Sequence, residues 1–123
     1  MMSMNAYQNY RRTQVTTASQ GELLLMLFEG AIKFAQQARL LIEERDFALA
    51  NTKLQRTQDI VNELMASLNF DSGPLAQDLY RLYAYIHERL VEANTKKDTA
   101  QLDEALQLLV EFRDTWRQVV HSA

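Results

Sequence analysis

The chain has 123 residues, 47% of them apolar, with 13 Lys and Arg against 16 Asp and Glu and a net charge of −3. This length predicts a single domain with enough apolar residues for a core. The charge argues against a nucleic-acid-binding protein, which needs a concentrated basic face. The chain contains no cysteine, which excludes disulfides, thiolate metal sites and cysteine nucleophiles.

Membrane and export signals are also missing from the sequence. The longest apolar run covers residues 23–28, far short of the ~20 residues that a membrane-spanning helix needs. The amino terminus has no basic stretch followed by an apolar one, so we expect no signal peptide. The sequence therefore predicts a soluble intracellular protein that does not insert directly into a membrane.

The first 44 residues divide into a tail and a helix. Residues 1–18 are polar, with scattered Met and Tyr and no helical period, and we interpret them as a tail. Ser19 and Glu22 have the Ser-x-x-Glu spacing of a capping box, which predicts a helix at about 20–44. Its expected inward residues are Leu24, Leu27, Phe28, Ala31, Ala35, Ala38 and Ile42.

A second helix is expected at about 47–69. Asp46 can cap this helix by accepting a hydrogen bond from a backbone N–H. Its inward residues are separated alternately by three and four positions, which is the spacing of a helix-bundle seam. They are Phe47, Ala50, Leu54, Thr57, Val61, Leu64 and Leu68. Residues 71–74 then form the clearest loop.

Two more helices are expected at about 74–94 and 99–121. Pro74 suits the first helical position, where its missing N–H costs nothing, and Asn94 is expected as a left-handed C-cap. The inward residues are Leu75, Leu79, Leu82, Ile86, Leu90 and Ala93 in the third helix, and Leu102, Ala105, Leu109, Phe112, Trp116 and Val120 in the fourth. Four amphipathic helices with short links predict an all-α, antiparallel four-helix bundle over residues 19–121.

Two of these helices carry more apolar surface than a core requires. Residues 23–28 are all apolar, so at 100° per residue they point all round the helix axis. Leu25 and Met26 face away from the core, while Tyr83 lies at the margin of the third helix and Tyr85 on its flank. Such a surplus often marks a binding face. Two interpretations remain open: a groove for a partner, or a patch that the tail covers.

Catalytic and metal-binding patterns are absent from the sequence. Neither His87 nor His121 follows a Glu by three residues, so the Glu-x-x-His motif of di-iron bundles is missing. There is no zinc-binding spacing and no phosphate-binding loop. His87 also lacks the following Lys and Gly of histidine phosphotransfer domains, which share this fold class. We expect no enzyme activity, metal or cofactor, although a helical enzyme with buried Arg and Glu stays open.

Three collinear stretches resemble one protein family. Residues 17–32, which read T-A-S-Q-G-E-L-L-L-M-L-F-E-G-A-I, are similar to the opening of the FliS-type flagellar secretion chaperones. Residues 82–94 and 113–116 resemble two further elements of that family. Tyr7 and Tyr10 fit its early Tyr-x-x-Tyr element, so the resemblance spans nearly the whole chain.

One position departs from the pattern of the family. Gln20 stands where many relatives have Pro, which removes a rigid residue from the first helical position. The capping pair of Ser19 and Glu22 is kept, so we expect the departure to leave the function unchanged.

The resemblance implies a cytoplasmic chaperone for newly made flagellin. Members of the family hold the carboxy-terminal segment of flagellin, which is disordered before assembly, and prevent premature polymerisation. They deliver flagellin to the flagellar type III export apparatus, whose membrane component recognises the complex. The resemblance implies neither enzyme activity nor a cofactor. The alternative is a helical-bundle adaptor for another export or regulatory protein.

The resemblance also suggests roles for residues in the tail and in the first helix. Tyr7 and Tyr10 would cover the empty binding site, as the amino-terminal segment of the family is thought to do; the alternative is an idle tail. Leu25 and Met26 would line a groove, or form a structural patch under the tail.

In the third helix, Tyr83 and Tyr85 could offer ring faces and polar tips to the client, or pack at a helix–helix margin. Arg89 either pairs with client carboxylates or forms an internal pair with Glu92 or Glu88. Structural roles are expected for Ser19 and Glu22 at the first cap, for Asn94 at a C-cap and for Trp116 in the core.

Overall fold

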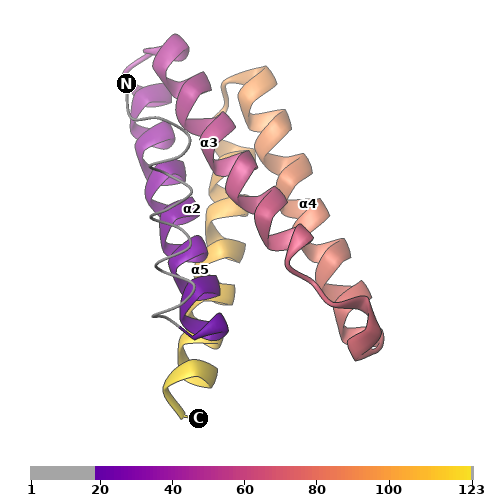
Figure 1. The fold of residues 1–123 in the computed structure, drawn as a ribbon. Helices are drawn as coiled ribbons and strands as arrows, with labels where there is room; N and C mark the ends of the chain where they lie inside the picture. The colour runs from indigo at the N-terminus through magenta and orange to yellow at the C-terminus, as the bar shows by residue number, and fades with distance from the viewer. Residues whose placement is uncertain (1–18, 123) are drawn as a thin grey trace, which may run out of the picture.

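The computed structural model describes residues 19–122, and of Ser72 only the backbone. Helix α2 (Gln20–Glu43) is followed by α3 (Phe47–Ala66), the 3-10 turn η1 (Phe70–Ser72), α4 (Pro74–Lys96) and α5 (Thr99–Ser122). Successive helices run in opposite directions (Figure 1). The predicted all-α, antiparallel four-helix bundle is confirmed. The tail interpretation of residues 1–18 lies outside the described residues.

Local hydrogen bonds set the starts of the helices. Ser19 Oγ accepts a hydrogen bond from the backbone N of Glu22 at 3.1 Å, which satisfies one of the free N–H groups at the start of α2. Asp46 Oδ1 accepts from the backbone N of Leu49 at 3.3 Å and caps α3. The backbone before α4 has φ 109° at Gly73, a conformation that costs little only for glycine.

Two helix ends differ from the sequence prediction. Helix α4 continues to Lys96, and its left-handed C-cap is Lys97, with φ 52°, instead of Asn94. Asn94 remains helical, and its Nδ2 donates a hydrogen bond to Oδ1 of Asn51 in α3 at 2.7 Å. Helix α3 ends at Ala66, three residues before the predicted end.

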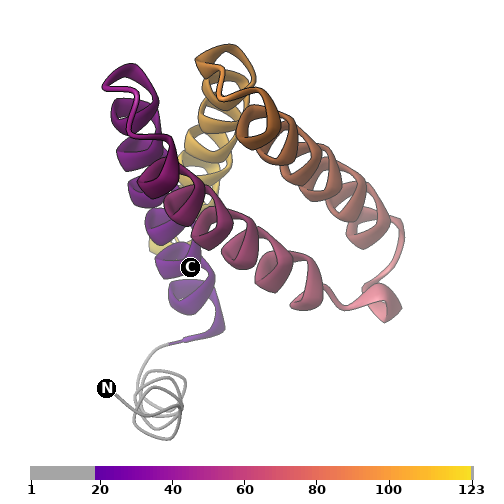
Figure 2. The same cartoon turned by 90° about the horizontal axis from the view of Figure 1, so that it is seen from above.

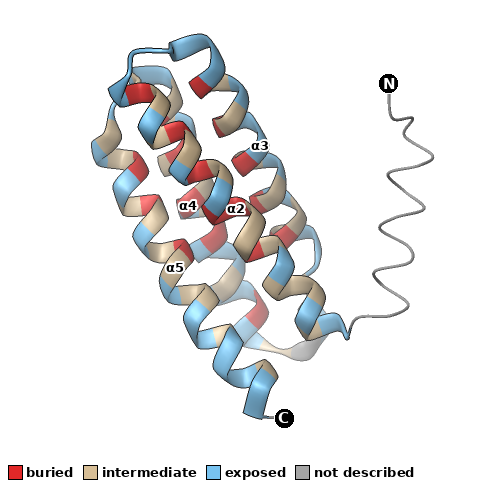
Figure 3. Cartoon of the chain, turned by 90° about the vertical axis from the view of Figure 1, so that its left-hand side faces the viewer, coloured by how far each residue is buried: buried red, intermediate tan, exposed pale blue. Residues whose placement is uncertain are grey.

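The helices pack in a ring. Each helix contacts its neighbours in chain order, and α5 closes the ring on α2. The buried positions of all four helices lie on the sides where the helices contact one another (Figure 3). None of the described helices is long and apolar enough to cross a membrane.

The core changes in side-chain size from one end of the bundle to the other. Toward the end where α2 and α4 finish, fully buried alanines pack beside leucines such as Leu54 and Leu102: Ala35, Ala38, Ala50, Ala93 and Ala105. Small side chains let helix axes approach closely. Large rings occupy the other half of the core, at Phe28, Tyr83, Phe112 and Trp116. Toward that open end, α3 and α4 diverge from α2 and α5 (Figures 1 and 2).

The inward face of α4 differs from the predicted one. Leu82 and Leu75 were expected inside, yet they are 42% and 67% exposed. Tyr83, expected at the margin, is only 7% exposed. The observed inward residues are Ala76, Leu79, Tyr83, Ile86, Leu90 and Ala93. Helix α4 turns this face inward because the ring of Tyr83 packs between Phe28 and Phe112 at the wide end of the core.

The other predicted faces agree with the structure in the middle and differ at some ends. In α3 the expected residues from Ala50 to Leu64 are buried, but Phe47 is 36% exposed. In α5 the expected residues are buried up to Leu109, and Phe112 and Trp116 are half-buried. These two rings are half-buried because they lie at the open end.

Candidate functional site

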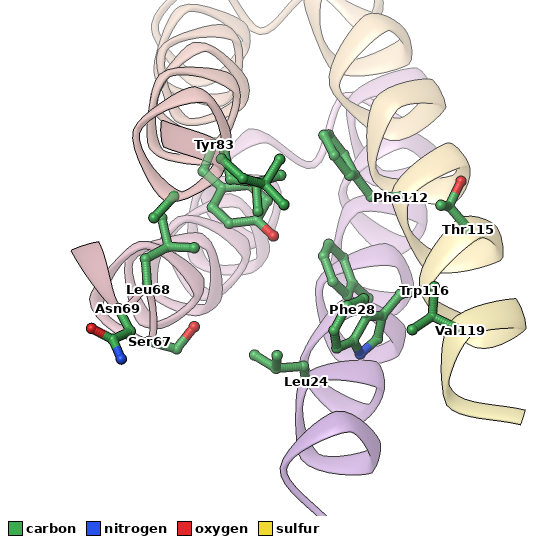
Figure 4. Close-up of a pocket in the computed structure, with 13 residues that line it drawn as sticks. Leu24, Phe28, Ser67, Leu68, Asn69, Tyr83, Phe112, Thr115, Trp116 and Val119 are labelled. Atoms are coloured by element: carbon green, nitrogen blue, oxygen red, sulfur yellow. The ribbon is translucent and has the colours of Figure 1, made fainter. Parts of the chain in front are cut away.

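A groove lies at the open end of the bundle, between the diverging helix pairs. Its volume is about 530 Å³, within the range of roughly 300–1,000 Å³ that is usual for binding sites. Its lining comes from α2, α4 and α5 and from residues 67–69, which directly follow α3 (Figure 4). We call it the apolar groove and define it by Leu24, Phe28, Leu68, Leu75, Leu79, Tyr83, Phe112, Trp116 and Val119, with Ser67, Asn69 and Thr115 at its polar positions.

Three aromatic rings from three helices form the floor of the apolar groove. The ring centroids of Phe28 and Tyr83 lie 6.2 Å apart, and those of Tyr83 and Phe112 lie 5.6 Å apart in an edge-to-face arrangement. Phe28 and Phe112 stack at 6.2 Å. Aromatic pairs at such distances attract one another beyond their buried area. The rings therefore join α2, α4 and α5 where the helices begin to diverge.

Trp116 forms one wall of the apolar groove. Its Nε1 donates a hydrogen bond to the backbone O of Gly21 at 2.9 Å, which fixes the indole against the first turn of α2. A Cβ atom at Gly21 would lie 3.0 Å from Cγ2 of Val120, so the glycine permits the close approach of α2 and α5. A second cavity of about 380 Å³ is also lined by Trp116, together with Ser19 and Val120.

The chemistry of the groove suits binding and offers no catalytic group. Its surface is mostly apolar, and Tyr83 is its titratable lining residue; burial raises the pKa of the Tyr83 hydroxyl. Within the described part of the chain, no cluster of His, Asp and Glu side chains could hold a metal ion. The groove can therefore accept the apolar face of a partner, as amphipathic helices do in helix-in-groove recognition.

Leu25 and Met26, the groove residues expected in the first helix, lie outside this lining. Leu24 and Phe28 line the groove instead. Each step along a helix turns the side chain by about 100°, so the residue after Leu24 faces another way. Leu25 is half-buried, and Met26 is 44% exposed. A partner-binding role for both remains a prediction.

Tyr83 lies in the groove, whereas Tyr85 and Arg89 make contacts elsewhere. The Tyr85 hydroxyl donates a hydrogen bond to Glu104 in α5, which raises the pKa of Tyr85. Arg89 forms ion pairs within α4, with Glu88 at 3.2 Å and with Glu92. Its guanidinium also lies over the ring of Tyr85, with 5.6 Å between the Cζ atom and the ring centroid. These contacts match the internal alternative, and client contacts remain a prediction.

Tyr7 and Tyr10, expected to cover the empty site, lie outside the described residues. Their role therefore remains a prediction.

Sequence reasoning missed the rim of the groove. Leu68 and Leu75 were expected in the core, and Val119 was assigned no role, yet all three line the groove. One signal could have located it. Each helix has an inward alanine near one end, and α2, α4 and α5 have inward rings toward the other end, so side-chain size favours a wider spacing between helices at the aromatic end.

Comparison with known proteins gives consistent matches. Residues 3–123 match the protein family described as "Flagellar protein FliS". The chain is 38% identical to the flagellar secretion chaperone FliS of Bacillus subtilis, over 99% of this chain and 91% of that protein. It is 34% identical to the protein of the same description in Salmonella typhimurium, over 85% of this chain and 79% of that protein.

A solved structure shows the same fold. The crystal structure of a flagellar chaperone from bacteria superimposes with a TM-score of 0.79 at 21% sequence identity, and the match covers 98% of each chain. At this identity, the similarity supports the bundle architecture.

Proposed function

This chain belongs to the FliS family of flagellar secretion chaperones, a family of chaperones and not of enzymes, and we propose that its client is the carboxy-terminal segment of flagellin. In this proposal the protein acts in the bacterial cytosol. It holds the segment while that segment is disordered and prevents premature polymerisation. It then delivers flagellin to the flagellar type III export apparatus at the membrane.

The observation that carries this proposal is the apolar groove with its aromatic floor. An amphipathic segment that folds on binding loses conformational entropy, so it needs a large apolar surface in return. The groove offers such a surface between α2, α4, α5 and the segment that follows α3. Its rings are held by one another, so the surface is already ordered before the client arrives.

Calorimetric titration tests the proposed client. The full chain is titrated with monomeric flagellin, either intact or without its carboxy-terminal segment. We expect tight one-to-one binding to the intact form only. Trp116, the single tryptophan of the chain, lines the groove, so its emission should shift to shorter wavelength as water leaves. If the folded protein binds neither form, flagellin is not the client. The alternative function, an adaptor for another export or regulatory protein, would then be favoured.

A charged substitution tests whether the groove is the binding site. Val119 is 49% exposed and lines the groove, and Val119→Glu should weaken flagellin binding at least about tenfold because the client would bury an unpaired carboxylate. Val91→Glu is the matched control, since Val91 is 41% exposed and lies outside the groove lining. Unchanged binding by a folded Val119→Glu variant would place the client elsewhere.

A further inference from the structure

The hydroxyl of Tyr83 is a polar group on the floor of the apolar groove, and it has no hydrogen-bond partner among residues 19–122. Tyr83 is 7% exposed, and its hydroxyl makes no hydrogen bond to any part of the chain that the structure describes. Figure 4 shows the hydroxyl directed from α4 into the space toward Phe28. The hydroxyl is not fully buried, so water can satisfy it in the free protein. A client that fills the groove would displace this water, and the hydroxyl would then cost free energy unless the client satisfies it.

The other polar side chains of the groove have partners or face solvent. Ser67 Oγ donates to the backbone O of Leu64 at 2.7 Å, and Asn69 Oδ1 accepts from the backbone N of Asp71 at 3.0 Å. The indole of Trp116 is bonded to Gly21, as described above. Thr115 is exposed, so water can satisfy it. Tyr83 is thus the residue whose hydroxyl lies on the floor of the groove and bonds to no residue in the described part of the chain.

The position of this hydroxyl is well defined before any client binds. The ring of Tyr83 packs against Phe112 and Phe28, whose centroids lie 5.6 and 6.2 Å away. Burial raises the pKa of the phenol, so the hydroxyl keeps its proton at neutral pH and can donate it. A fixed donor loses little conformational entropy when it forms a hydrogen bond.

We propose that the Tyr83 hydroxyl donates a hydrogen bond to an uncharged side-chain oxygen on the apolar face of the client helix, and that this bond selects the client and its register. This inference rests on the proposed function. The acceptor is the side chain of an Asn, Gln, Ser or Thr. A carboxylate would lose its hydration among the apolar side chains of the groove, and an apolar side chain would leave the donor unsatisfied once water is displaced.

One substitution removes the donor and leaves the ring. Tyr83→Phe in the full chain should bind intact flagellin about tenfold more weakly than the unsubstituted protein, because the client acceptor is then buried without a partner. Tyr80→Phe is the matched control on the same helix. Tyr80 is 42% exposed, its ring packs on Phe70 at 5.8 Å outside the groove lining, and its substitution should leave the affinity unchanged.

The stability of the free protein separates client recognition from a structural role. Because the hydroxyl bonds to no residue that the structure describes, Tyr83→Phe should leave the thermal midpoint unchanged or raise it. A lowered midpoint together with weaker binding would overturn the inference in favour of a structural role. Binding within twofold of the unsubstituted protein would also overturn it.

The client side of the bond is located by a double-mutant cycle. Each Asn, Gln, Ser and Thr of the flagellin carboxy-terminal segment is replaced by Ala, and each variant is titrated into the unsubstituted protein and into Tyr83→Phe. We expect one client position whose effect disappears in Tyr83→Phe. Additive effects at every position would overturn the inference. Failure of the unsubstituted protein to bind flagellin is a different result and would overturn the proposed function itself.

Discussion

Trp116 connects the stability of the bundle with its binding surface. One edge of the indole is bonded to the backbone of Gly21, and the ring lines the apolar groove. The absence of a side chain at Gly21 lets α2 and α5 approach, and that approach brings the carbonyl within reach of the indole. A single contact between α2 and α5 therefore shapes one wall of the groove.

Removal of this hydrogen bond should lower stability by a small amount. Trp116→Phe keeps an aromatic ring but removes the N–H, and we expect the free energy of unfolding to fall by about 1 kcal/mol. Urea denaturation followed by circular dichroism measures the change. Phe70→Leu is the control: Phe70 is 50% exposed, so we expect a change within about 0.5 kcal/mol. A fall no larger than that of the control would mean that the indole bond contributes no net stability.

Among the helices, α4 carries an ion-pair network along its last turns. Glu92 accepts a hydrogen bond from Lys96 Nζ at 2.7 Å and also pairs with Arg89. The bond from Lys96, with the nearby charges, lowers the pKa of Glu92. The folded protein therefore favours the ionised carboxylate. This contribution to stability is present above the pKa of Glu92 in the unfolded chain and is lost as the pH falls through the lowered pKa.

The Glu92 carboxylate predicts a defined pH dependence. Lys96→Met should move the pKa of Glu92 back toward its ordinary value, which carbon-detected NMR titration measures. Lys96→Met should be less stable than the unsubstituted protein at neutral pH. This difference should shrink in acid, where Glu92 is protonated in both proteins. Lys33→Met on the exposed face of α2 is the control and should leave Glu92 unchanged. An unaltered Glu92 titration in Lys96→Met would contradict this account.

At the scale of the molecule, the bundle is closed at its alanine end and open at its aromatic end. The buried alanines bring the helix backbones close together, while the rings at the other end hold a wider space. Both ends belong to the same four helices. The groove is therefore a product of core packing.

A larger side chain at the closed end should destabilise the bundle. Ala105 is fully buried, and Ala105→Leu adds volume that the close-packed core cannot take up without strain, which should cost about 1–3 kcal/mol. Ala66→Leu is the matched control because Ala66 is exposed at the end of α3, and we expect a change within about 0.5 kcal/mol. Urea denaturation of both variants measures the difference. Equal stability would show that the alanine end is not tightly packed.

The sequence by itself determined the helices, the bundle and the family. The cap at Ser19, the start at Pro74 and the alternating spacing along α3 depend on residues that are close in the chain, so they can be recognised without a structure. The end of α4 was less predictable because Asn94 binds Asn51, which is distant in sequence.

Only the tertiary structure decided which face of α4 turns inward and where the groove opens. The faces that contain Leu82 and Tyr83 have nearly the same periodicity, so spacing along one helix does not separate them. The choice depends on the width of the core at that level, which Phe28 of α2 and Phe112 of α5 set together. A groove between helices is a property of their packing, and no single segment of the sequence contains it.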